Sequence, residues 1–117
     1  MKIYLDTNFL IYLIENKLFH NFQDFLSENF KNYEIYIFLT TLAEIGNINK
    51  KILKIVKLLI RKNIIKVDER KGKIDELLKE VSKDSIIATE DENLKDFLKE
   101  NKRKFIEIRG KHFYLFQ

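Results

Sequence analysis

The hydrophobic positions of this chain change period repeatedly, and this predicts short strands alternating with amphipathic helices. Runs of β-branched and aromatic residues, such as Ile35-Tyr36-Ile37-Phe38, are typical of strands. Apolar residues three or four positions apart, such as Phe22, Phe25 and Leu26, are typical of helices. Strands are predicted at residues 2–5, 34–39, 64–67, 85–89, 105–108 and 113–116. Helices are predicted at residues 8–15, 18–30, 41–45, 50–62, 73–82 and 92–100, with a break at Gly46-Asn47-Ile48-Asn49 and a turn at Gly110.

This alternation predicts a compact α/β fold with a mainly parallel sheet that helices cover on both faces. The chain has 117 residues, no Pro and only 3 Gly, so no linker divides it, and residues 1–117 are expected to form one domain. In such sheets, functional groups collect at the carboxyl ends of the strands, where the following helices begin.

The composition excludes several classes of protein. Hydrophobic residues make up 45% and charged residues 34%, as in globular domains. The absence of Cys excludes disulfide scaffolds, thiol catalysis and cysteine-based metal sites, and it favours the cytoplasm. Asp6 interrupts the apolar N-terminal stretch, so neither a membrane span nor an export signal is expected. The net charge of +4 is compatible with a polyanionic partner.

Acidic residues stand where the predicted topology brings separate segments together. Asp6 ends the first strand, and Glu44 lies in the first turn of the helix after the second strand. Asp75 lies in the first turn of the helix at residues 73–82, and Asp91 follows the fourth strand by two residues. All four are therefore expected at one edge of the sheet.

Each acid also has a simple structural explanation, because acidic residues stabilise helix N-termini. Thr41-x-x-Glu44 has the pattern of a capping box, and Asp91 precedes a helix. Four clustered carboxylates repel one another, however, unless some are protonated or a divalent cation lies among them. Ligands that are all oxygen favour Mg²⁺ or Mn²⁺ over zinc. Asp84 competes with Asp75, but it starts the fourth strand, roughly 16 Å from this edge.

The segments that carry these acids resemble the four acidic motifs of PIN-domain nucleases, in the same order and over nearly the whole chain. They are Leu5-Asp6-Thr7-Asn8-Phe9-Leu10, Thr41-x-x-Glu44, the Asp75 helix and Ala88-Thr89-Glu90-Asp91-Glu92-Asn93-Leu94. The resemblance is to VapC-like toxins and to archaeal PIN proteins related to nucleases that process ribosomal RNA. It departs from the family at Ile74, where a small residue is usual.

The resemblance implies a three-layer α/β/α sandwich and metal-dependent endonucleolytic cleavage of RNA. It assigns catalysis to the four acids and places Asp6 and Asp91 nearest the Mg²⁺ or Mn²⁺ ion. Glu44 and Asp75 would bind through water or orient the attacking water. Supporting positions are Thr7, Asn8 and Thr89. RNA is the implied partner, and an antitoxin protein and a second copy of the chain are further candidate partners.

Basic residues gather on one face of the helix predicted at residues 50–62. This basic stripe comprises Lys50, Lys54, Lys57 and Arg61, and the opposite, apolar face comprises Ile52, Ile55, Val56 and Leu59. The stripe is either a solvated helix face or a surface that contacts RNA phosphates. A second basic cluster is predicted from Lys102, Arg103, Lys104, Arg109 and Lys111, whereas His20 and His112 are isolated.

Two other functions compete with the nuclease. A phosphotransfer site or receiver module would need a second Asp near Asp6, and Asn8 occupies that place. No paired spacing of Ser, His and Asp supports a hydrolase triad. A PIN-like protein that keeps its acids could also serve as a non-catalytic RNA-binding or assembly module, and only a cleavage assay separates that alternative from the nuclease.

Overall fold

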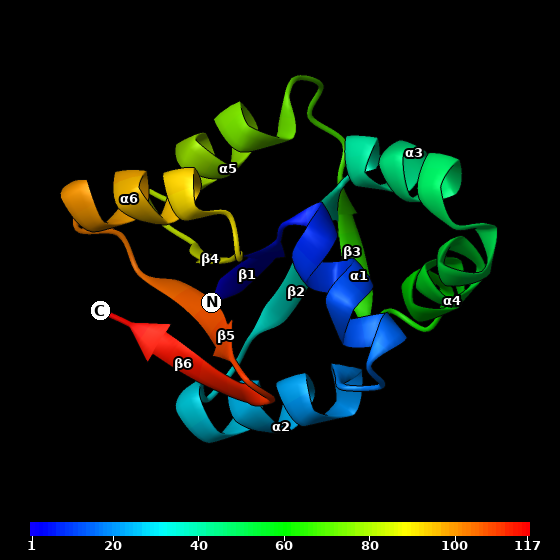
Figure 1. The fold of residues 1–117 in the computed structure, drawn as a ribbon, viewed down its shortest axis with the longest axis horizontal. Helices are drawn as coiled ribbons and strands as arrows, with labels where there is room; N and C mark the ends of the chain where they lie inside the picture. The colour runs from blue at the N-terminus through cyan, green and yellow to red at the C-terminus, as the bar shows by residue number, and fades with distance from the viewer.

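A computed structural model describes all of residues 1–117 and has one six-stranded sheet at its centre (Figure 1). The strand order is β3-β2-β1-β4-β5-β6. Its strands are β1 (Lys2–Leu5), β2 (Glu34–Phe38), β3 (Ile65–Asp68), β4 (Ile86–Ala88), β5 (Phe105–Arg109) and β6 (His112–Phe116). All neighbouring strands are parallel except β5 and β6, which form a hairpin that turns at Gly110.

The helices cover both faces of the sheet and complete three layers. They are α1 (Thr7–Glu15), α2 (Phe19–Asn29), α3 (Leu39–Ile48), α4 (Lys50–Arg61), α5 (Ile74–Val81) and α6 (Glu92–Glu100). The predicted α/β/α sandwich with a mainly parallel sheet is confirmed. None of these helices combines the length and apolar content that crossing a membrane requires.

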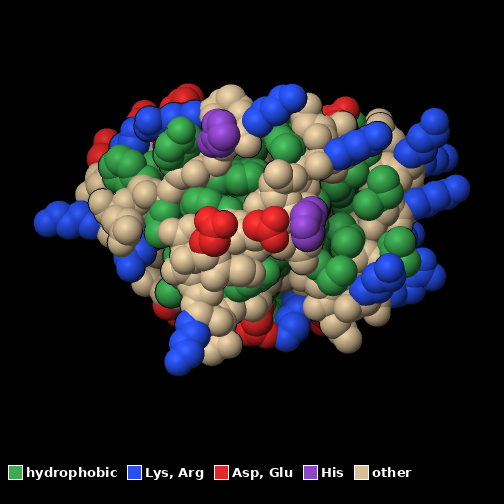
Figure 2. All heavy atoms as spheres, turned by 90° about the horizontal axis from the view of Figure 1, so that it is seen from below, with side chains coloured by type: hydrophobic (Ala, Val, Ile, Leu, Met, Phe, Trp, Pro, Cys, Tyr) green, Lys and Arg blue, Asp and Glu red, His purple; other side chains and the backbone are tan.

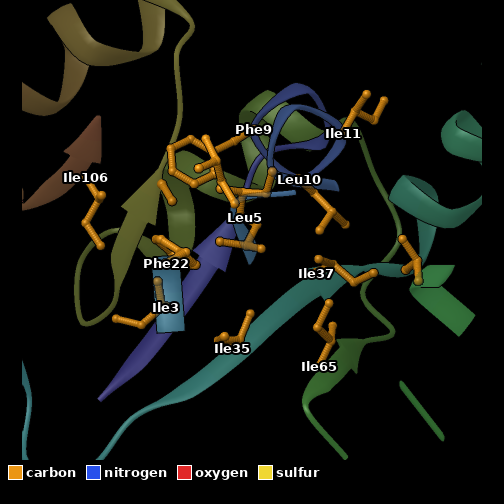
Figure 3. Close-up of a cluster of buried hydrophobic side chains, with 14 of the residues drawn as sticks. Ile3, Leu5, Phe9, Leu10, Ile11, Phe22, Ile35, Ile37, Ile65 and Ile106 are labelled. Carbon is orange, nitrogen blue, oxygen red and sulfur yellow. The ribbon is translucent and has the colours of Figure 1, made fainter. Parts of the chain in front are cut away.

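Side chains that alternate along the strands divide the core into two clusters. Ile3 and Leu5 of β1 face α1 to α4 and join the larger cluster, which also holds Phe9 and Phe22 (Figure 3). Tyr4, between them in sequence, faces the opposite way and packs in the cluster that contains residues of α5 and α6. Because neighbouring strand residues point to opposite faces of the sheet, one apolar strand contributes side chains to both core clusters.

The strand order reverses between β1 and β4. The chain passes from β1 to β2 on one side and returns to place β4 on the other side, where Leu5 is in register with Ala88. The Asp6 N–H donates to the Ala88 carbonyl at 2.9 Å and so extends this pairing past the end of β1. Such reversals open a crevice at the carboxyl ends of the strands.

The prediction for the segment after β2 was wrong in two respects. Helix α3 begins at Leu39 rather than Thr41, and it continues through Gly46 as far as Ile48. A Cβ on Gly46 would lie 3.3 Å from Leu53 Cδ2, so this glycine permits close packing of α3 on α4 and does not end the helix. Asn49 alone separates the helices, and its side chain accepts hydrogen bonds from the Lys51 and Ile52 N–H groups.

Helix α4 buries a narrower apolar face than the periodicity predicts. Ile52 and Val56 are buried, but Ile55, on the same apolar face, is 44% exposed. In the basic stripe, Lys54, Lys57 and Arg61 line a shared groove together with apolar side chains from α3, α4 and β3. The stripe therefore borders an apolar groove.

Candidate active site

The four predicted acids lie at one cavity at the carboxyl edge of the sheet. The cavity has a volume of about 430 Å³ and is lined by Asp6, Thr7, Asn8, Glu44, Asn47, Ile48, Ile74, Asp75 and Asp91. We refer to Asp6, Glu44, Asp75 and Asp91 as the cavity acids. They come from the end of β1, from α3, from α5 and from the residue before α6, so residues up to 85 positions apart meet here.

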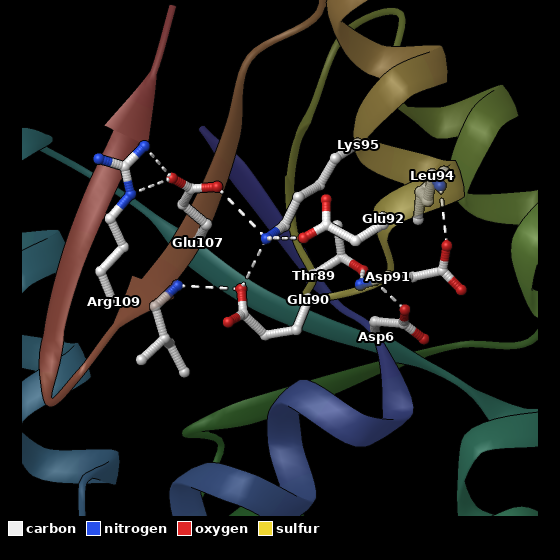
Figure 4. A network of polar contacts seen from close by, with 10 residues as sticks. Asp6, Thr89, Glu90, Asp91, Glu92, Leu94, Lys95, Glu107 and Arg109 are labelled. Carbon is white, nitrogen blue, oxygen red and sulfur yellow. Dashed lines mark hydrogen bonds and ion pairs between the residues drawn. The ribbon is translucent and has the colours of Figure 1, made fainter.

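Asp6 is the most buried of the cavity acids, and each of its two carboxylate oxygens accepts a hydrogen bond. Its Oδ1 accepts a hydrogen bond from the Thr7 N–H at 2.8 Å. Its Oδ2 accepts one from Thr89 Oγ1 at 2.8 Å, which is drawn in Figure 4. Burial raises the pKa of Asp6 and the two hydrogen bonds lower it, but the nearby charges of Asp75 and Asp91 add to the rise. The pKa of Asp6 therefore lies above its ordinary value.

Thr7 connects Asp6 to the next cavity acid. Its backbone N–H binds Asp6, while its buried hydroxyl donates to Glu44 Oε1 at 2.7 Å and lies 3.3 Å from Thr41 Oγ1. Glu44 stands in the second turn of α3, because this helix begins two residues earlier than predicted. The capping-box explanation of Thr41 and Glu44 is thus wrong, since both residues contact Thr7 instead.

Asp91 caps a helix and also lines the cavity. It is the N-cap of α6, where Oδ1 accepts a hydrogen bond from the Leu94 N–H at 2.8 Å. Its own N–H donates to Thr89 Oγ1 at 3.1 Å. Thr89 therefore connects the backbone of Asp91 to the carboxylate of Asp6, and one hydroxyl fixes the spacing between two cavity acids.

The structure distinguishes the two candidates for the third acid. Asp75 is exposed in the first turn of α5 and lines the cavity. Asp84 lies at the opposite edge of the sheet, in a separate pocket with Lys83, Ile86 and Lys104. Only Asp75 can act together with the other cavity acids.

The fold that surrounds this cavity matches a solved structure closely in shape. No protein-family model matches the sequence, and no curated protein matches it. Among solved structures, that of the PIN domain endonuclease Utp24 superposes with a TM-score of 0.74 at 15% sequence identity, covering 97% of this chain and 90% of that chain. The chain has the PIN-domain fold. The architecture implied by the acidic motifs is therefore confirmed.

In this PIN fold, the cavity acids have no cationic partner within the protein. Every ion pair in the structure involves other carboxylates, those of Asp24, Glu34, Asp68, Glu80, Glu90, Glu92 and Glu107. No three acidic or histidine side chains are close enough to enclose a metal ion by themselves. Mg²⁺ usually binds one or two carboxylates and keeps several waters, so this open, all-oxygen donor set fits a hydrated hard cation.

Neither histidine belongs to the cavity. His20 lies on α2, where it faces Asp24, and His112 starts β6. Both are visible at the molecular surface (Figure 2).

The structure divides the second basic cluster predicted near the C-terminus into two parts. Lys102, Arg103 and Lys104 precede β5, whereas Arg109 ends that strand and pairs with Glu107.

The sequence analysis missed an ionic network beside the cavity, which is centred on the buried residues Lys95 and Glu107. The Lys95 side chain is only 7% exposed and lies 3.3 Å from both Glu90 Oε2 and Glu107 Oε1 (Figure 4). Glu107 also pairs with Arg109 at 2.7 Å. One signal was present in the sequence, because Glu107 interrupts the apolar strand Phe105-Ile106-Glu107-Ile108, and a carboxylate inside a buried strand requires a partner.

Proposed function

We propose that this PIN-fold protein is a Mg²⁺- or Mn²⁺-dependent endoribonuclease that hydrolyses RNA phosphodiester bonds. The observation that carries the proposal is the group of four unpaired cavity acids at the strand-order reversal of the sheet. The structural neighbour is described as an endonuclease, which supports the same reaction class. Carboxylate oxygens without a cationic partner suit a divalent cation, and such an ion supplies Lewis acidity that activates water and neutralises charge on phosphoryl oxygens.

The cavity acids would have two different roles, metal binding and orientation of water. Asp6 and Asp91, at the ends of β1 and β4, would hold the ion. Glu44, fixed by the Thr7 hydroxyl, and the exposed Asp75 would orient the attacking water in line with the phosphorus. Thr89 keeps Asp6 and Asp91 in a fixed relation. No protein nucleophile is needed.

The direct test is incubation of the purified protein with an RNA of mixed sequence, with and without Mg²⁺ or Mn²⁺. We expect internal cleavage that requires the ion and stops when a chelator is added. RNA binding without cleavage under any of these conditions would assign the chain to the non-catalytic alternative. The same experiment with RNAs of defined structure would show which RNA the protein cleaves and at which sites.

We also propose that the basic stripe of α4 contacts RNA phosphates. The charge-reversal pair Lys54→Glu and Lys57→Glu should weaken binding of all RNA sequences alike, because phosphate contacts carry no sequence information. The slope of log K against log salt should fall by about 1.4 when two single-strand contacts are lost. Filter binding or anisotropy at several salt concentrations measures both effects.

A matched control uses one lysine of α4 and the residue that follows the helix. Lys51→Glu combined with Lys62→Glu changes the net charge equally but alters residues outside the basic stripe. Equal weakening by both pairs would show that only overall charge matters. A loss confined to one RNA sequence would also contradict phosphate contact by the stripe.

A further inference from the structure

Lys95 is the only lysine or arginine among the buried residues of this protein. Its ammonium lies 3.3 Å from Glu90, 3.3 Å from Glu107 and 3.7 Å from Glu92. Burial alone would lower the pKa of Lys95, but attraction to Glu90 and hydrogen bonds with Glu107 and Glu90 raise it above its ordinary value. Lys95 is therefore charged, and three carboxylates surround it.

Stability alone does not account for a charge at this position. Lys95 is flanked on α6 by the buried core residues Leu94 and Leu98, so an apolar side chain could pack here without the cost of desolvating an ammonium. Replacing a buried ion pair by well-packed apolar residues is often neutral or stabilising. The charged network thus points to a requirement for a defined geometry.

The network fixes the segment that follows β4. Glu90 Oε2 accepts a hydrogen bond from the Ile108 N–H of β5 at 3.0 Å and also pairs with Lys95. Glu107, the second partner of Lys95, is held in turn by Arg109. Glu90 is therefore tied both to α6 and to β5.

Glu90 lies between Thr89 and Asp91, and its side chain points away from theirs (Figure 4). Thr89 binds the carboxylate of Asp6, and Asp91 lines the cavity. Rotation of this short segment would move all three side chains together, so anchoring Glu90 on one side fixes Thr89 and Asp91 on the other.

We propose that Lys95 and Glu90 are positioning residues, whose ion pair holds Thr89 and Asp91 in the orientation that the cavity requires. This inference rests on the proposed nuclease function for its kinetic consequence. The geometry of the metal-free protein provides a second consequence that does not depend on catalysis.

The kinetic test uses Lys95→Met, which removes the charge and keeps the length, and Glu90→Gln, which keeps an oxygen for the Ile108 N–H. Each variant should lower kcat for Mg²⁺-dependent RNA cleavage about 10- to 100-fold, the usual cost of losing a partner that orients metal ligands. KM for RNA should stay within about twofold, since neither residue lines the cavity. The kcat of the double variant should fall no further than that of either single variant, because both substitutions remove the same ion pair.

Lys83→Met, at an exposed lysine without an ion pair, is the matched control and should cleave RNA like the native protein.

The structural test is amide hydrogen exchange of the metal-free protein. The Asp91 and Leu94 amides donate to Thr89 Oγ1 and Asp91 Oδ1, so they report the orientation of this segment. In Lys95→Met both amides should exchange about tenfold faster, whereas amides in the pairing of β1 with β2 should keep their protection.

The outcomes separate the two proposals. A native protein that cleaves no RNA would overturn the nuclease function, and the exchange data alone would then decide the positioning role. Unchanged exchange at Asp91 and Leu94 in Lys95→Met would overturn the positioning role. The positioning role would also be overturned if the native protein cleaved RNA and the variants had the same kcat, or if the Lys95→Met variant lost amide protection evenly throughout the sheet.

Discussion

Replacing Asp6 with asparagine should abolish RNA cleavage and leave the fold intact. Asparagine is nearly isosteric, and its side-chain oxygen can still accept the hydrogen bond from the Thr7 N–H at the start of α1. The substitution removes one of the two carboxylates proposed to hold the ion. Metal catalysis contributes several kcal/mol, and each 1.4 kcal/mol is a factor of ten, so a loss on the order of 100-fold or more in kcat/KM is expected.

The metal-free Asp6→Asn variant should be no less stable than the native protein at neutral pH. The pKa of Asp6 is raised in the folded state, chiefly by burial, so ionised Asp6 costs stability at every pH above that pKa. Asparagine has no charge to desolvate and removes this cost. Thermal unfolding and circular dichroism check both the stability and the fold.

Asp84→Asn is the matched control, because it makes the same chemical change at an exposed aspartate on the opposite edge of the sheet. It should cleave RNA like the native protein. Equal activity of Asp6→Asn and the native protein would remove Asp6 from the mechanism, whereas equal loss in both variants would show that the assay reports overall charge.

The positions of Asp6 and Asp91 were predictable because both depend on local sequence. Each follows a short apolar strand, and parallel neighbouring strands end at the same edge of a sheet. The register of Leu5 with Ala88 then brings the two ends together. Glu44 was also predicted at this edge, even though the start of its helix was misplaced by two residues. Thr41 and Glu44 are three residues apart, so they share a helix face wherever the helix begins.

The local misassignments have physical causes that the sequence pattern does not reveal. A glycine often signals the end of a helix, but Gly46 lies inside α3, where Leu53 Cδ2 would be 3.3 Å from a Cβ at this position. Ile55 lies on the apolar face of α4 together with the buried Ile52 and Val56, yet it remains 44% exposed. Both outcomes depend on how α3 and α4 pack, which is a property of the tertiary structure.

The ionic network could not be predicted in full because its members are brought together only by the sheet. Glu90 follows β4, Lys95 lies in α6 and Glu107 lies in β5. Their spacing along the sequence does not predict that they form ion pairs. The division of the C-terminal basic cluster has a similar origin. Strand β5 separates Lys104 from Arg109, so residues near in sequence lie at opposite ends of the strand.

Mg²⁺ or Mn²⁺ should raise the melting temperature of the native protein. An ion that binds only the folded state stabilises it by RT ln(1 + [L]/Kd), about 2.7 kcal/mol at a hundredfold excess over Kd. For a domain of this size, the expected rise is on the order of 10 °C. The effect should be large because the cavity acids have no cation of their own, so a bound ion would relieve the repulsion that Asp75 and Asp91 exert on Asp6.

The double variant Asp6→Asn, Asp91→Asn should lose most of this metal-induced rise. Asparagine at position 91 can still cap α6, so the variant tests charge rather than helix formation. Asp84→Asn combined with Asp96→Asn removes the same charge from two exposed residues away from the cavity and should keep the full rise. Differential scanning fluorimetry across a metal titration measures all three proteins. Equal rises in the native protein and the Asp6, Asp91 variant would mean that these carboxylates form no shared metal site, and the nuclease mechanism would lose its basis.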